Sequence, residues 1–283
     1  MCPDHPVGDS LSEPRSPRRI ALGVAYRGTA YQGWQSQPGG RTVQDVLEAA
    51  LSSFAAVNRI ATVCAGRTDA GVHAVQQVVH LDAPVERDAF SWVRGTNRFL
   101  PHDVAVQWCM QVESDFHARA SARGRAYRYI VLESPVRPSL ESGLVGWVFK
   151  PLEHEAMREA AAMLVGTHDF SSFRAAECQA ASPVKELRRL EIRKAGRYWH
   201  FDFEASAFLH HMVRNIMGTL LAIGQGRRSP AWMREVLDAR SRDAAAPTFA
   251  AEGLYFLGPS YDARHRIPSR AADAHDWMLQ APD

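Results

Sequence analysis

The sequence predicts an α/β protein, of the α+β kind, whose chain folds into two halves with largely antiparallel sheets. Segments with the two-residue alternation of strands and segments with the apolar spacing of helices follow one another, a mixture typical of sheets covered by helices. The 283 residues, 46% of them hydrophobic, also exceed what one compact core usually contains. We therefore expect a cleft between the two halves, which is the usual place for a binding site.

The first half is expected to contain four strands and two helices. Its first strand has apolar residues at alternating positions, and a long loop with Tyr31 and Trp34 follows. Thr42 is predicted to cap the next helix, because the apolar residues after it follow helical spacing. The predicted strands are 20–26, 60–65, 77–81 and 104–112, and the predicted helices are 43–54 and 89–98.

The second half repeats this type of order. Alternation resumes on both sides of Ala195 and Gly196, which predicts a β-hairpin turning at this pair. Gly166 is expected to end an Ala-rich helix, because glycine is common just after a helix C-terminus. The predicted strands are 125–132, 146–149, 185–193, 198–205 and 254–257, and the predicted helices are 152–165, 208–223 and 230–239.

Two tails are expected to flank these halves. The first residues are rich in proline, serine and charge and lack the apolar core of a secretory signal, so we expect a disordered N-terminal tail over 1–19. The N-terminal subdomain then covers 20–113 and the C-terminal subdomain covers 114–260. A C-terminal tail is expected over 261–283.

Composition argues against several classes of protein. The four cysteines lie far apart without a C-x-x-C pair, which disfavours a disulfide framework or structural zinc and fits the reducing cytoplasm. The most apolar segment, 207–224, is interrupted by two histidines and an arginine, so no membrane span is expected. Net charge is only +2, but just three of the 33 basic residues are lysine. Arginine suits phosphate and base contacts, although biased gene composition explains its abundance equally well.

A loop with two glycines follows the predicted strand 60–65. Gly66 and Gly71 allow sharp turns or the close approach of a ligand, so Asp69 is expected to be displayed at a strand end. The alternative is that Asp69 only caps a helix beginning at Ala70. On the neighbouring residues alone, the cap is the more common role.

A basic and aromatic face is predicted for the strand 125–132. Arg125, Tyr127 and Tyr129 alternate along it, so their side chains share one face. A groove of this kind lets a base stack on a ring while a guanidinium contacts a phosphate. The alternative is that the tyrosines are half-buried in an ordinary sheet.

The predicted helix 208–223 has one apolar side and one unusual polar side. His210, His211 and Arg214 fall on the polar side, where glutamate and lysine are more common. A metal site at the two histidines is not favoured. Adjacent residues diverge by about 100° on a helix, and no carboxylate joins them at helical spacing.

Taken together, these segments resemble the tRNA pseudouridine synthase A family. The resemblance extends from about residue 20 to residue 258, and so many collinear motifs make a chance match implausible. The matching motifs are YQGWQ at 31–35, AGRTDAGVH at 65–73, DFHAR at 115–119, DFSSF at 169–173, HHMVRN at 210–215 and AEGLY at 251–255.

The resemblance implies an isomerase that needs no cofactor and no metal. Its substrates would be uridines 38, 39 and 40 in the anticodon arm of tRNA. The N-glycosidic bond is broken, the base turns, and C5 is joined to the sugar instead. The resemblance also implies a cytoplasmic homodimer in which two RRM-like α/β halves flank a central RNA-binding cleft.

The same resemblance assigns roles to individual residues. Asp69 matches the catalytic aspartate, and Arg214 matches the arginine that pairs with it. Tyr127 matches the tyrosine that contacts the target base, and Arg67 matches a residue that helps to displace this base from the stem. A single carboxylate beside a cation fits a reaction that must exclude water. We also predict substrate contacts from Thr68, Arg125, His210, His211 and Leu254.

Two rival functions remain at this stage. A non-catalytic RNA-binding protein would use the same arginine and tyrosine surfaces, with Asp69 as a cap. A hydrolase would use the histidine, aspartate and serine of segment 166–171. That proposal is weak, because a catalytic triad is assembled in space rather than in sequence and no nucleophile elbow is present.

Overall fold

The predicted strands of both halves join in one sheet. The computed structural model describes residues 18–268, so the tail segments 1–17 and 269–283 lie outside the described residues. Within the described part, ten strands form a single, mostly antiparallel sheet. They are β1 (Arg18–Tyr26), β2 (Val63–Cys64), β3 (His73–Ala83), β4 (Val104–Gln111), β5 (Ala122–Glu133), β6 (Gly146–Val148), β7 (Gly166–Asp169), β8 (Val184–Ala195), β9 (Tyr198–Ala205) and β10 (Leu254–Tyr261).

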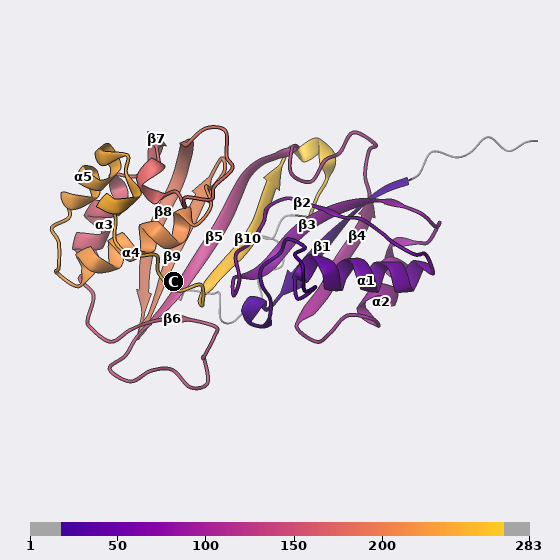
Figure 1. Cartoon of the computed structure of the whole chain (residues 1–283), viewed down its shortest axis with the longest axis horizontal. Helices are drawn as coiled ribbons and strands as arrows, with labels where there is room; N and C mark the ends of the chain where they lie inside the picture. Colours follow the sequence, from indigo (N-terminus) through magenta and orange to yellow (C-terminus); the bar gives the residue numbers. More distant parts are fainter. Residues whose placement is uncertain (1–17, 269–283) are drawn as a thin grey trace, which may run out of the picture.

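The strand order joins the beginning and the end of the chain. Hydrogen-bonded neighbours follow the order β4-β1-β3-β10-β5-β9-β8-β7, while β2 pairs with β3 and β6 pairs with β5. The late strand β10 therefore lies between β3 and β5 (Figure 1). It runs antiparallel to β5 along its length, but pairs with β3 in parallel only through Tyr255 with His73 and Phe256 with Ala74. The two halves thus meet at a short parallel junction.

The helices lie in two groups at the two ends of the sheet (Figure 1). In the described chain they are α1 (Val43–Ala55), α2 (Ala89–Asn97), α3 (His154–Ala162), α4 (Met212–Gly224) and α5 (Trp232–Ala239). One hydrophobic cluster includes residues of both groups together with alternate strand residues such as Leu22, Tyr127 and Phe201. Both groups therefore cover the same face of the sheet, and the predicted α/β class with largely antiparallel strands is confirmed.

Local sequence explains the first helix. α1 begins directly after Thr42, whose hydroxyl accepts a hydrogen bond from the Asp45 backbone N–H at 3.2 Å. Leu47 and Leu51 are fully buried on its inner side. The cap and the apolar spacing that predict this helix are therefore both confirmed.

Other boundaries differ from the predictions. β1 includes Arg18 and Arg19, and β10 extends to Tyr261, so both strands reach into the segments predicted as tails. Gly166 does not end a helix: α3 stops at Ala162, and Gly166 opens β7 by pairing with Leu187. Residues 208–211 precede α4 instead of belonging to it.

The length and composition of the helices can be compared with the predicted absence of a membrane span. None of the helices within residues 18–268 is long and apolar enough to cross a membrane. α4, which lies in the most apolar segment, has 13 residues.

Candidate active site

Asp69 lies in the loop between β2 and β3, and side chains from the protein interior hold this loop. The Gln77 side chain donates to the Gly66 carbonyl at 2.5 Å and accepts from the Gly66 N–H at 3.3 Å. The Thr68 hydroxyl forms a hydrogen bond with the Tyr26 hydroxyl at 2.7 Å. The segment that leads into Asp69 is thus fixed.

The interpretation of Asp69 as a helix cap is wrong. The Asp69 carbonyl accepts a hydrogen bond from the Val72 N–H at 3.2 Å, which closes a tight turn. Gly71 has a φ of 82°, a left-handed conformation that glycine adopts without strain. The chain then enters β3 at His73 instead of starting a helix.

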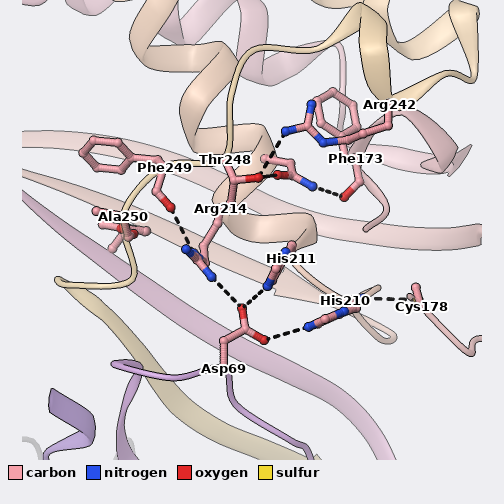
Figure 2. A network of polar contacts seen from close by, with 12 residues as sticks. Asp69, Phe173, Cys178, His210, His211, Arg214, Arg242, Thr248, Phe249 and Ala250 are labelled. Atoms are coloured by element: carbon pink, nitrogen blue, oxygen red, sulfur yellow. Dashed lines mark hydrogen bonds and ion pairs between the residues drawn. The ribbon is translucent and has the colours of Figure 1, made fainter. Parts of the chain in front are cut away.

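A turn before α4 brings two histidines to the same side. His211 has a φ of 61°, which is uncommon for a residue other than glycine. The rings of His210 and His211 lie 4.0 Å apart, centroid to centroid, and both point toward Asp69 (Figure 2). The expected divergence of the two side chains is wrong, because it holds only inside a regular helix.

Three side chains contact the Asp69 carboxylate (Figure 2). Arg214 Nη1 lies 3.1 Å from Oδ2. His210 Nε2 lies 3.4 Å from Oδ1, and His211 Nε2 lies 3.4 Å from Oδ2. Asp69 and Arg214 are 145 positions apart in the sequence, and their side chains are only 20% and 17% exposed. The structure brings them together as the resemblance implies, while their catalytic roles stay predictions.

A segment late in the chain fixes the Arg214 side chain. Arg214 Nε donates to the Phe249 carbonyl at 2.9 Å, and the Phe249 N–H donates to the Arg214 carbonyl at 3.2 Å. Gly218 permits this approach, because a Cβ at that position would lie 2.1 Å from the Pro247 carbonyl oxygen. α4 and the segment 246–250 together therefore hold the guanidinium on Asp69.

The cluster favours an ionised Asp69. Burial raises the pKa of Asp69, but the contacts with His210, His211 and Arg214 outweigh this effect, so the pKa lies below its ordinary value. Asp69 in turn raises the pKa of His210, whereas burial lowers the pKa of His211. The two histidines therefore differ: His210 holds its proton more readily than His211.

Tyr127 reaches this region from β5 and packs among aromatic rings. Its ring centroid lies 5.1 Å from that of Phe208, nearly edge-on, and 5.0 Å from that of Phe256. Tyr127 is 9% exposed. Burial, together with the Asp69 charge, raises the pKa of its hydroxyl, which stays neutral. The neighbouring Tyr129 is fully buried, and both rings belong to the main hydrophobic cluster, so both are more buried than the half-buried tyrosines of the alternative.

Two predicted arginine contacts occur in different environments. Arg67 is exposed, and its side chain makes no hydrogen bond or ion pair to any of residues 18–268. Arg125 is partly buried and donates to four backbone carbonyls, those of Ala65, Arg119, Ala122 and Ser206. Arg125 therefore braces the strand end that leads into the Asp69 loop, and of these two arginines only Arg67 presents a free guanidinium.

The side chains of Thr68 and Leu254 are buried, at 7% and 4% exposure. The Thr68 hydroxyl already pairs with Tyr26, and Leu254 belongs to the main hydrophobic cluster. Neither side chain is presented at a surface, so both support the site from within. Their predicted substrate contacts stay predictions.

The cluster also offers donors for a metal ion. One carboxylate oxygen and one ring nitrogen from each of His210 and His211 lie within 4.8 Å of one another. The Arg214 guanidinium occupies the same carboxylate at 3.1 Å, and its positive charge opposes a second cation there. We therefore assign no metal to these residues.

The residues of the rival hydrolase do not contact one another as a triad. Asp169 Oδ1 accepts the Ser171 backbone N–H at 2.9 Å, and His168 Nε2 contacts the Val165 carbonyl at 3.2 Å. Within the described structure, His168 makes no hydrogen bond to Asp169 or to Ser171, so the histidine of a triad is missing from this group. The hydrolase interpretation has no structural support.

Several supporting residues escape sequence reasoning. The Asn215 side chain is polar, yet it is fully buried. Its amide donates to the Phe173 carbonyl at 2.9 Å and accepts from the Thr248 hydroxyl at 2.6 Å. The signal present in the sequence is Gly218, since a glycine inside a helix often marks the close approach of another backbone.

Comparisons with known proteins identify the family of this chain. The family model for tRNA pseudouridine synthase matches residues 23–119 and 160–262. The tRNA pseudouridine synthases A of Methylibium petroleiphilum and Polaromonas naphthalenivorans are 67% and 65% identical, over 92% of this chain and 99% of each relative. A chain of the "Crystal Structure of a Cbf5-Nop10-Gar1 Complex" matches 80% of this chain and 60% of its own length, with 12% identity and a TM-score of 0.34, too low to carry an argument. With the family model and such close relatives over nearly its whole length, the chain belongs to the tRNA pseudouridine synthase family of isomerases.

Proposed function

We propose that this chain isomerises uridines 38, 39 and 40 of the tRNA anticodon arm to pseudouridine, with Asp69 as the nucleophile. The observation that carries the proposal is the Asp69 carboxylate, ionised and held at 3.1 Å by Arg214. The relatives named tRNA pseudouridine synthase A support the substrate class.

The geometry suits nucleophilic attack by a carboxylate. At an effective dielectric near 20, a guanidinium in contact favours ionised Asp69 by about 4 kcal/mol before desolvation is subtracted. The ionised oxygen attacks either the ribose C1′ or the uracil C6, and both routes need the same residue in the same place. The reaction rearranges bonds within one nucleotide, so it balances without a cofactor or a metal.

The target uridine must leave the base stack before attack. Extrusion costs a few kcal/mol, which the protein recovers by new contacts. Arg67, exposed two residues before Asp69, is free to enter the space that the base leaves. Tyr127, with its ring beside the site, is proposed to contact the displaced base.

The location and the oligomeric state of the protein belong to the same proposal. We place the reaction in the cytoplasm, with tRNA, and we propose a homodimer. Exposed apolar side chains near β6 support a second subunit: Val136, Leu140 and Phe149 are 70%, 91% and 56% exposed. Light scattering should give twice the chain mass of 31.4 kDa, whereas a monomer at micromolar concentration would contradict the homodimer.

Mapping of the product tests the proposed function. An unmodified tRNA transcript with uridines at 38, 39 and 40 is incubated with the purified chain, and carbodiimide adducts are located by reverse transcription. We expect pseudouridine at these positions, and none in a matched transcript that carries cytidine there. Binding without any pseudouridine would favour the non-catalytic RNA-binding rival.

A further inference from the structure

His210 has the geometry of a group that exchanges protons with the substrate. Its Nε2 lies 3.4 Å from Oδ1 of Asp69, so the imidazole borders the place where the uridine must sit. Its side chain is 40% exposed, against 20% for Asp69. The His210 backbone N–H donates to Cys178 Sγ at 3.4 Å, which helps to hold the turn. The ring is therefore fixed beside the carboxylate but open on one side.

The backbone at this turn also calls for an explanation. His211 adopts a left-handed conformation, and strain of this kind persists where surrounding contacts impose it, often at functional sites. The result is that both imidazoles face Asp69. Arg214 alone already supplies a cation to this carboxylate, so charge neutralisation does not account for two more nitrogen groups.

Formation of pseudouridine requires a proton to move. Once C5 has bonded to the ribose C1′, C5 still holds its hydrogen, while the other end of the ring, N1, must gain one. A base beside the ring is needed to remove the C5 proton, and neither Arg214 nor a neutral Tyr127 is suited to accept it.

We propose that His210 accepts the proton that leaves uridine C5 and returns it to N1; the proposal rests on the function proposed above. The C5–H proton passes to His210 Nε2, and the C5–H electron pair forms the C5=C6 double bond. This balance applies to attack at C1′: the electron pair of the N1=C6 bond returns to N1, which takes the proton from the imidazolium. No atom or electron is gained or lost.

The charge state of Asp69 determines when His210 can accept the proton. While Asp69 is esterified to the substrate it carries no charge, so the imidazolium beside it is no longer stabilised and releases its proton to water on its open side. When Asp69 is set free, its charge returns 3.4 Å from Nε2 and raises the pKa of His210. Glu177 and Cys178 act in the same direction, burial acts against them, and His211 faces the same ring. His210 is thus most basic at the stage when C5 must lose its proton.

An isotope experiment tests the assignment. Wild-type and His210→Gln chains are given tRNA transcripts with uridine or with 5-deuteriouridine at the target positions. We expect turnover to fall about 10²- to 10⁴-fold in His210→Gln, and the deuterium isotope effect on turnover to exceed that of the wild type. A matched His211→Gln variant, which leaves the His210 imidazole in place, should keep the isotope effect of the wild type. Slow turnover of His210→Gln without a larger isotope effect would overturn the proposal.

A second substrate separates proton transfer from structural damage. In 5-fluorouridine tRNA, C5 has no proton to lose, so His210→Gln should form the C5-linked nucleotide at the wild-type rate. An equal loss of turnover on both substrates would show that His210 acts before the C5 proton leaves, which would overturn the proposal. Normal turnover of uridine by His210→Gln would refute this inference alone, whereas a wild-type chain that makes no pseudouridine would refute the proposed function.

Discussion

Cations from a distant part of the chain set the charge of Asp69. Burial alone would raise the pKa of this carboxyl, and the contacts with His210, His211 and Arg214 reverse the direction. A carboxylate whose pKa is lowered stays ionised as the pH falls below the ordinary range for aspartate. Asp69 is therefore ionised throughout the neutral range, as the proposed nucleophile must be.

Removal of Arg214 should change this balance. In Arg214→Gln, burial of Asp69 remains while one cation is lost, so we expect the pKa of Asp69 to rise. The NMR titration of its carboxyl carbon measures this shift, and the acid limb of activity should move to higher pH with it. Arg214→Lys, which keeps the charge, should show a smaller rise. An unchanged titration in a folded Arg214→Gln protein would contradict the ion pair.

Tyr127→Phe separates the ring from the hydroxyl. The ring packs against Phe208 and Phe256, and these contacts survive the substitution. We expect the Kd for tRNA to stay within about twofold, since aromatic stacking provides the contact, even if single-turnover rates drop. Filter binding gives the Kd. A tenfold loss of binding would instead identify the hydroxyl as the anchor.

At the scale of elements, α4 holds the site together through Gly218. Gly218→Ala would place a Cβ 2.1 Å from the Pro247 carbonyl, so the segment that holds Arg214 must move. We expect a loss of about 1–3 kcal/mol in the free energy of unfolding together with a large loss of activity. Urea unfolding and single-turnover rates measure the two effects.

A matched control exists on the same helix. Ala222→Gly should lower the free energy of unfolding by about 1 kcal/mol through helix propensity, without displacing Pro247. Its activity should stay that of the wild type. Equal losses of activity in the two variants would mean that general destabilisation, rather than the position of Arg214, explains the effect of Gly218→Ala.

The elements differ in how far sequence could predict them. α1 follows from the Thr42 cap and its apolar spacing, which are local signals. β7 is missed because a glycine after a helical segment resembles a helix stop, and only pairing with β8 makes it a strand. The start of α4 is misplaced because its apolar pattern continues backward through the turn at His211.

At the scale of the whole molecule, the site depends on contacts that no local pattern contains. Asp69 and Arg214 meet across 145 positions because β10 closes the sheet between the two halves. Only the family resemblance pointed to this pair. The support from Phe249 and Gln77 depends on tertiary contacts as well, so sequence alone could not predict it.

Stability should depend on pH through buried histidines. Burial lowers the pKa values of His73, His80 and His200 to about 4, against 6.5 ordinarily. The unfolded chain then binds protons that the folded chain rejects, so this contribution is complete above pH 6.5 and is lost as the pH falls toward 4. Calorimetry should show a Tm that drops between pH 7 and pH 5, and His200→Phe should reduce the drop. A flat Tm over this range would contradict neutral buried histidines.

The most direct test of the account is tritium release from tRNA that carries [5-³H]uridine in the anticodon arm. Asp69→Asn keeps the size of the side chain but removes the nucleophile and its charge. We predict release at least about a thousandfold slower than in the wild type, with tRNA still bound. Asp169→Asn, at an aspartate outside the site, should release tritium at the normal rate. Undiminished release by Asp69→Asn would contradict the central claim.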